Sequence, residues 1–258
     1  TPVDPQVSAM AAAIAAKHSA ASRAVLFYGS CLRQQQLEGL MLDFYLIVSD
    51  YRSAYRKRWL ATANRLIPPN VFYFEHGGLV AKYAVLSEAD FARECGVDAF
   101  TVSTAARFAQ PARLVWSADA QAGSRALDAI SHAAPTLLDW ALPIAVDGSP
   151  ETIWKCAFGL TFAAELRAER LDRSSSIVEA DPRRYYQFGL HALREIAESR
   201  GVEPAGEVPF SMSTAQAKRW WKKMQRRGKW YSVARLAKAS FTFAGGVDYI
   251  AWKINRHA

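Results

Sequence analysis

Cysteine is scarce in this sequence: Cys31, Cys95 and Cys156 are the three among 258 residues. An odd number of widely spaced cysteines fits neither a disulfide framework nor a zinc site. A reducing compartment is therefore the simpler expectation. Long apolar runs are also missing, because none approaches the roughly 18 residues that a spanning helix needs. The apolar stretch 10–16 is short and no basic stretch precedes it, so we predict part of an N-terminal helix there and not a signal peptide.

Acidic residues are nearly absent from the C-terminal part. Between Gln216 and the end the sequence holds eleven basic residues and one acid, Asp248, whereas the whole chain has a net charge of +8. The rest of the chain is thus close to neutral. This imbalance indicates a partner rich in phosphate groups, met by the tail.

The hydrophobic pattern changes along the chain. Up to Trp116, short apolar runs bounded by turn residues alternate with helical spacing, and beyond it helical spacing dominates. We predict strands over 24–28, 42–48, 71–75, 79–86 and 113–116 and helices over 5–19, 51–66, 87–95, 121–141, 150–171, 182–199 and 214–226. In 51–66, we expect Tyr55, Trp59, Ala63 and Leu66 on the buried face. The predicted class is α+β, divided into 1–116, 117–212 and a tail, 213–258.

One pair of segments suggests chemistry. Gly29-Ser30 follows the first predicted strand, which ends at Tyr28, and Asp43 lies at the start of the second. A Gly-Ser turn offers backbone N–H groups and a hydroxyl to a phosphate, and a carboxylate beside it can hold Mg²⁺. The pattern is typical of polymerase-β-type nucleotidyltransferases, which mostly carry Asp-x-Asp where this chain has Asp43-Phe44-Tyr45. A chance Gly-Ser turn with a capping aspartate is the alternative.

A wider resemblance rests on several segments in order: Tyr28-Gly29-Ser30, Leu42-Asp43-Phe44, Val48-Ser49-Asp50, Lys82-Tyr83-Ala84-Val85-Leu86-Ser87, Phe158-Gly159-Leu160-Thr161-Phe162-Ala163-Ala164-Glu165-Leu166-Arg167 and Lys238-Ala239-Ser240-Phe241-Thr242-Phe243-Ala244-Gly245. Together they resemble the mitochondrial translocator-assembly-and-maintenance family, which are peripheral CDP-diacylglycerol synthases, and their bacterial relatives. The resemblance implies a polymerase-β-type nucleotidyltransferase domain, a helical, winged-helix-like domain and a C-terminal amphipathic helix that touches the membrane. It also implies Mg²⁺-dependent transfer of CMP from CTP to phosphatidate.

The resemblance also implies roles for individual residues. Gly29, Ser30 and the preceding Tyr28 would hold the nucleotide. Lys82 and Arg107 would contact phosphates, with a surface salt bridge as the alternative for Arg107. Asp43, Glu165 and Asp50 would be metal ligands, with a cap at the end of its strand as the alternative for Asp50. The catalytic set would be Asp43, Lys82, Glu165 and Arg167. The sequence departs from the family pattern at Cys31, where the family has glycine, and at Glu165, where it has aspartate. These departures leave the lipid acceptor open, with ceramide phosphate as an alternative.

The basic tail is rich in tryptophan, which a merely solvated charged segment seldom contains. The expected membrane residues are Trp220, Trp221, Lys222, Lys223, Trp230, Lys238 and Trp252. We therefore expect an anionic membrane as partner, at the cytoplasmic face of a bacterial inner membrane, in preference to nucleic acid. A non-catalytic protein of the same fold, binding nucleic acid or membrane, is the competing interpretation.

Overall fold

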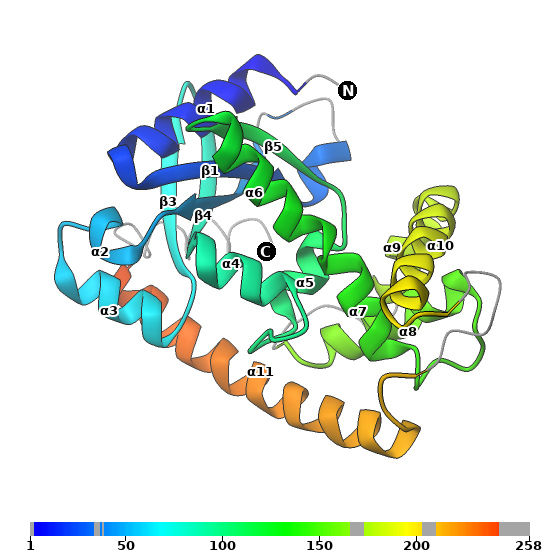
Figure 1. Cartoon of the computed structure of the whole chain (residues 1–258). Coiled ribbons are helices and arrows are strands. Elements are labelled where there is room, and N and C mark those ends of the chain that lie inside the picture. The colour runs from blue at the N-terminus through cyan, green and yellow to red at the C-terminus, as the bar shows by residue number, and fades with distance from the viewer. Residues whose placement is uncertain (1–2, 34–36, 38, 166–172, 203–209, 243–258) are drawn as a thin grey trace. The chain divides into compact units, whose positions relative to one another are not determined.

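The computed structural model describes residues 3–33, 37, 39–165, 173–202 and 210–242 (Figure 1). The chain divides into two compact units: residues 1–91, 111–127 and 233–258 form the first, and residues 92–110 and 128–232 form the second. The strands are β1 (Ser22–Tyr28), β2 (Met41–Val48), β3 (Asn70–His76), β4 (Leu79–Ser87) and β5 (Ala112–Ser117). The helices are α1 (Pro5–Lys17), α2 (Tyr51–Ala54), α3 (Arg58–Leu66), α4 (Glu88–Cys95), α5 (Ser103–Phe108), α6 (Ala120–Ser131), α7 (Ala133–Ala141), α8 (Pro150–Phe162), α9 (Arg173–Glu179), α10 (Pro182–Ser199) and α11 (Thr214–Thr242), with short 3-10 turns at Ser19–Ala21 and Ser30–Arg33.

A five-stranded mixed sheet forms the centre of the first unit. Its order is β3-β4-β2-β1-β5. The central pair, β2 and β4, is parallel, and the other neighbours are antiparallel. The β3–β4 hairpin turns at Gly77 and Gly78, both in the left-handed region that glycine tolerates best. The mixed sheet with helices confirms the predicted α+β class.

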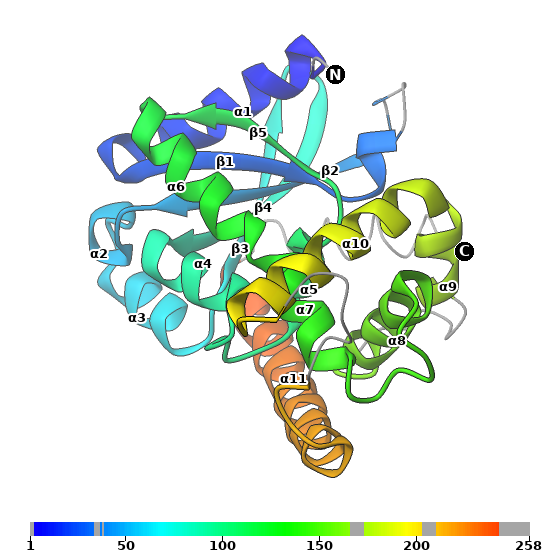
Figure 2. The same cartoon turned by 45° about the vertical axis from the view of Figure 1, so that its right-hand side comes forward.

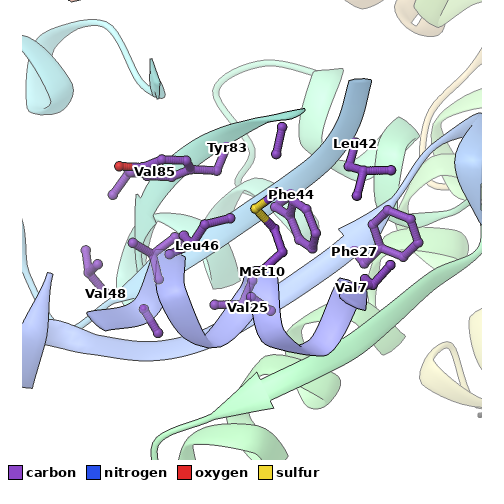
Figure 3. Close-up of a cluster of buried hydrophobic side chains, with 14 of the residues drawn as sticks. Val7, Met10, Val25, Phe27, Leu42, Phe44, Leu46, Val48, Tyr83 and Val85 are labelled. Carbon is purple, nitrogen blue, oxygen red and sulfur yellow. The ribbon is translucent and has the colours of Figure 1, made fainter. Parts of the chain in front are cut away.

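Helix α1 covers one face of this sheet (Figure 3). Asp4 caps its first turn by accepting a hydrogen bond from the Gln6 N–H, and Pro5 follows at the first helical position. Its buried side chains recur with helical spacing: Val7, Met10, Ala11, Ile14 and Ala15. They pack against alternate residues of β1, β2 and β4, such as Phe27, Phe44 and Val85. Because side chains alternate along a strand, the residues between these face away from α1.

The other face of the sheet lies on the side of α6 (Figure 2). Gly123 of α6 packs closely on β5, since a Cβ at this position would lie 3.3 Å from both Leu114 and Ser117 side-chain atoms. This close approach explains a glycine inside a helix, where it is otherwise unfavourable by about 1 kcal/mol.

The segment predicted as one helix, 51–66, is interrupted. Tyr55 is extended after α2, and Lys57 is extended before α3. Tyr55 remains buried, but α3 restarts with a new phase that buries Ala61 and Asn64. Asn64 fixes this arrangement: its Oδ1 accepts from the Asn70 N–H at 2.6 Å and the Tyr55 hydroxyl at 3.1 Å. The prediction that Trp59 and Leu66 are buried is therefore wrong, because both are exposed.

The described residues of the second unit form helices and turns without a strand. The predicted winged-helix-like domain therefore has its helices but no β-hairpin wing among these residues. Aromatic residues dominate its core. Trp154 stacks on Phe158 with ring centroids 5.3 Å apart, and its indole N–H donates to the Tyr185 carbonyl at 2.9 Å. Gly189 of α10 allows close packing, because a Cβ there would lie 2.6 Å from Pro150 Cβ of α8.

Several predicted boundaries differ from the structure. The helix predicted over 121–141 is two helices that meet at His132, and α8 ends at Phe162, well before the predicted end at 171. The predicted tail helix continues to Thr242, and the compact units do not separate it as a domain of its own, since α11 has residues in both.

Candidate functional site

Asp43 lies beside the turn that follows β1. Tyr28, the last residue of β1, pairs with Asp43 across the antiparallel ladder. The next residue, Gly29, has a φ of +93°, and a Cβ on it would lie 3.1 Å from Asp43 Oδ2. Glycine is required here both for its backbone conformation and for the space next to the carboxylate. The structure thus brings the Gly-Ser turn and Asp43 together.

Lys82 lies on the other side of Asp43. The two residues are register partners on the parallel strands β2 and β4. The Lys82 ammonium lies 3.1 Å from Asp43 Oδ1, and both side chains are partly exposed. The ammonium and the carboxylate are not oriented as in a hydrogen bond, and Asp43 Oδ1 is a buried oxygen without a hydrogen-bond partner. The pair is therefore held by charge, and this oxygen still has a lone pair for a cation.

The alternation along β2 explains how an apolar strand carries this carboxylate. Leu42 and Phe44 enter the core beneath α1, so Asp43 and Tyr45 face the opposite side. Tyr45 stands where an Asp-x-Asp motif has its second carboxylate, and its ring packs on Tyr28 with centroids 5.3 Å apart. The strand therefore supplies one carboxylate, backed by two buried tyrosines.

One carboxylate beside a phosphate-binding turn can hold Mg²⁺, which commonly takes one or two protein carboxylates together with substrate phosphates. Asp43 Oδ1 fits this use because it is a buried oxygen that no hydrogen bond satisfies. Among the described residues, no group of three or more His, Cys, Asp or Glu side chains gathers into a cluster suited to a metal ion. The site does not resemble an all-protein metal cage.

Asp50 does not join Asp43. It caps α2, where its carboxylate accepts hydrogen bonds from the Arg52 and Ser53 N–H groups at 2.8 and 3.0 Å and from the Ser53 hydroxyl at 2.6 Å. The side-chain hydrogen bond from Ser53, followed by its backbone one, lowers the pKa of Asp50. Seven residues of extended chain, about 23 Å at 3.3 Å per residue, separate it from Asp43. The two carboxylates cannot ligate one metal ion.

Two further predicted residues belong to the second unit. Arg107 lies on α5 and is half-buried, and Glu165 lies in the turn after α8, also half-buried. A Cβ on Gly228 of α11 would lie 2.3 Å from the carbonyl oxygen of Ala164, so α11 packs tightly on the turn that carries Glu165. The side chain of Ser30 and all of Arg167 lie outside the described residues. The roles of these four residues stay predictions.

The predicted membrane residues divide into two groups. Trp221 is only 2% exposed, and its indole N–H donates to the Trp140 carbonyl at 2.8 Å. Trp220 packs against the same core, with its ring centroid 4.9 Å from that of Trp140. The membrane prediction is wrong for Trp221, which is buried in the core of the second unit. Trp220 is half-buried, and its membrane role stays a prediction.

Lys238 is also used internally: its ammonium donates to the Ile67 carbonyl and, at 2.8 Å, to the Pro69 carbonyl. Burial, with the neighbouring Arg235 charge, lowers the pKa of Lys238 to about 7. Its predicted contact with the membrane is therefore wrong as well. Lys222, Lys223 and Trp230 are exposed as expected, and Trp252 lies outside the described residues.

Sequence reasoning missed two features. One is the packing of Tyr45 on Tyr28 beside Asp43, although the position of Tyr45 two residues after Asp43 on a strand indicates that the two share a face. The other is the outer face of α3, with Trp59 and Leu66, which the helix break at residues 55–57 exposes.

No helix among the described residues is both long enough and apolar enough to cross a membrane.

Comparison with known proteins gives little guidance. No family model matches the sequence, and neither does any curated protein. Among solved structures, the chain is similar to a nucleotidyltransferase-like protein from Exiguobacterium sibiricum 255-15, with a TM-score of 0.33 and 9% identity over 93% of this chain and 77% of that one. A likeness at this level carries no argument about function, so the function has to be argued from the Asp43 site.

Proposed function

We propose that this protein is a Mg²⁺-dependent cytidylyltransferase that transfers CMP from CTP to a lipid phosphate, with phosphatidate as the acceptor. The products are CDP-diacylglycerol and pyrophosphate. The observation that carries the proposal is the arrangement around Asp43, which has a glycine turn against one carboxylate oxygen and the Lys82 ammonium 3.1 Å from the other. Anion-binding backbone, carboxylate and cation are the three elements that a nucleotide triphosphate with its metal ion requires.

The bonds exchanged explain why one carboxylate and a lysine suffice. An oxygen of the lipid phosphate forms a bond to the α-phosphorus of CTP, and the bond from that phosphorus to the bridging oxygen breaks, releasing pyrophosphate. The nucleophile is already an anion, so no strong general base is needed. The barrier comes largely from bringing two anions together, which positive charge lowers.

Each residue of the site has a part in this scheme. The backbone of Gly29 and Ser30 binds phosphate oxygens, and Tyr28 ends the strand that positions them. Lys82 pairs with Asp43 before the nucleotide arrives and then turns its charge toward the triphosphate. Asp43 would hold Mg²⁺, which when bound neutralises phosphate charge.

The family resemblance implies further roles, which stay part of the proposal. Arg107 would contact a phosphate, Glu165 would be a metal ligand, and Glu165 and Arg167 would belong to the catalytic set. The acceptor is a membrane lipid, so the enzyme acts at an anionic surface, the cytoplasmic face of a bacterial inner membrane.

The test uses purified protein, Mg²⁺ and CTP labelled at the α-phosphate, with liposomes that contain phosphatidate, ceramide phosphate or neither. Label should enter the lipid phase with phosphatidate. Asp43→Asn removes one charge at nearly constant shape and should reduce the rate about 100-fold or more, the scale expected for an essential electrostatic group. Lys82→Met should act similarly, while Lys82→Arg keeps the charge and part of the rate.

Asp98→Asn is the matched control, because Asp98 is an exposed aspartate of the second unit, and its rate should be unchanged. Transfer to ceramide phosphate alone would retain the chemistry and overturn the acceptor. Absence of transfer to either lipid, with the protein folded, would refute the reaction and favour a non-catalytic protein of this fold.

A further inference from the structure

The outer face of α3 carries apolar side chains among cations. Trp59 is 47% exposed and Leu66 is 63% exposed, and their spacing of seven residues places them on the same side of α3. Arg58 and Arg65, on the same stretch of helix, are also exposed. The interrupted helix explains the pattern, because the restart of α3 turns these residues outward and turns Asn64 inward.

The last part of α11 lies beside the C-terminal end of α3, within the first unit (Figure 1). Arg235 Nε donates to the Pro68 carbonyl at 2.7 Å, and Lys238 donates to the carbonyls on either side of it in the chain. These three carbonyls belong to the segment that directly follows Leu66. The C-terminal turns of α11 are thereby tied to the end of α3.

These hydrogen bonds come from Arg235 and Lys238, and apolar side chains of the same turns of α11 are exposed. Val233 is 48% exposed and Leu236 is 66% exposed. Leu236 lies two residues before Lys238, and Leu66 lies directly before the Ile67 carbonyl that Lys238 binds. Leu66 and Leu236 are thus each within two residues of a residue that makes this attachment.

The charged residues of α3 with its flanking segments, and those of α11, are all basic. Residues 51–74 contain Arg52, Arg56, Lys57, Arg58 and Arg65 and no acid, and residues 214–242 contain nine basic residues and no acid. The five cations of the first segment are all exposed. Neither segment offers a carboxylate that would weaken the attraction of an anionic surface.

We propose that Trp59, Leu66, Val233 and Leu236, with the cations Arg56, Lys57, Arg58 and Arg65, form a surface that binds an anionic phospholipid bilayer. We name it the α3–α11 surface. Apolar side chains enter the boundary between headgroups and acyl chains, and the surrounding cations pair with lipid phosphates. The sequence suggested Lys238 as a lipid contact and gave Arg235 no role. Both residues instead hold the end of α11 against the segment that follows α3.

The apolar residues decide between a bilayer and nucleic acid. Cations alone would suit either partner, since both present many phosphates. Leu66, Val233 and Leu236 are aliphatic, however, and a nucleic acid offers them neither the stacking that aromatic side chains find nor an apolar volume. A bilayer accepts them together with Trp59, whose ring suits the membrane interface.

The proposal rests on the membrane location given in the proposed function, but its test is separate from the reaction, since binding is measured without nucleotide or acceptor lipid. The assay is flotation with vesicles of phosphatidylcholine, with and without phosphatidylglycerol as the anionic lipid. The protein should float with the anionic vesicles and lose binding as salt rises, because surface charge is screened within about 10 Å at 0.1 M salt.

Variants locate the surface. Arg58→Glu with Arg65→Glu should weaken binding about 25-fold or more, because each basic contact contributes about fivefold. Leu66→Ser with Leu236→Ser should weaken it about tenfold or more by removing buried apolar groups. The matched controls are Arg194→Glu on α10 and Leu127→Ser on α6, which are exposed residues of other helices and should bind as the unmodified protein does.

Circular dichroism melting verifies that each variant is folded, and Trp59→Ser serves as a second apolar variant if the leucine pair does not fold. Equal loss in controls and test variants would overturn the proposed location. Failure of the unmodified protein to float with anionic vesicles would overturn the proposal, as would retention of binding in both test pairs. Preference for a duplex oligonucleotide over vesicles at equal salt would assign the surface to nucleic acid instead.

Discussion

Two tryptophans of α11 test the division of this helix into an inner and an outer face. Trp221 is 2% exposed and Trp230 is 75% exposed, although both come from the same basic segment. We expect Trp221→Ala to lower the free energy of unfolding by about 3–5 kcal/mol, the usual cost of truncating a large buried aromatic residue. Trp230→Ala should change it by no more than about 0.5 kcal/mol, as exposed substitutions commonly do.

The contribution of the Trp221 hydrogen bond to stability can be measured separately from that of its side-chain volume. Its indole N–H donates to the Trp140 carbonyl at 2.8 Å, and its ring lies edge-on to that of Trp220 at 5.1 Å between centroids. Trp221→Phe retains an aromatic ring but leaves the buried carbonyl without its donor. An unsatisfied buried group costs about 1–3 kcal/mol, so this variant should fall between the unmodified protein and Trp221→Ala.

Urea unfolding followed by far-ultraviolet circular dichroism measures these effects without depending on tryptophan fluorescence. With a denaturant dependence of about 1–3 kcal/mol/M, Trp221→Ala should move the midpoint of the helical unit down by 1 M or more, on the order of the cost divided by that slope. If the free energies of unfolding of Trp221→Ala and Trp230→Ala differ by less than about 1 kcal/mol, the burial of Trp221 is refuted. The membrane prediction for Trp221 would then regain support.

Two more predictions concern packing and pH. Gly228→Ala should lower the free energy of unfolding by about 2 kcal/mol or more, because its Cβ would lie 2.3 Å from the Ala164 carbonyl oxygen, whereas Gly148→Ala, with no atom within 4 Å, should be neutral in thermal melts. Burial lowers the pKa of His18 below 6.5, and the Ala54 carbonyl at 3.0 Å only partly offsets it. The unfolded chain therefore binds the proton more readily, so His18 should reduce stability as pH falls below about 6.5. His18→Gln should flatten this part of the stability profile in urea titrations between pH 5 and 7, and an unchanged profile would exclude His18 as its source.

Local sequence patterns predicted much of the first unit. Apolar runs between turn residues identified all five strands within about two residues, and Gly77-Gly78 identified the hairpin. The juxtaposition of Gly29 and Asp43 was also predictable, because a turn after one strand and a carboxylate at the start of its antiparallel neighbour fall at the same edge. These features depend on neighbouring residues and on the two-residue period of a strand, both of which can be read from the chain.

The structure alone established what depends on contacts between distant segments. It placed Lys82 beside Asp43, because only the parallel pairing of β2 with β4 makes them register partners. It also assigned the tail's residues to opposite roles. Trp221 and Lys238 satisfy carbonyls at Trp140 and Ile67, some 81 and 171 residues away, and no local pattern encodes such partners.

Composition thus determined that the C-terminal segment is basic and rich in tryptophan, whereas tertiary packing decided which of these side chains face outward. The physical reason is that a helix buries whichever face its neighbours cover, and those neighbours are supplied by the fold. The same holds for α3, where the interruption after Tyr55 changed the helix phase and exposed Trp59 and Leu66.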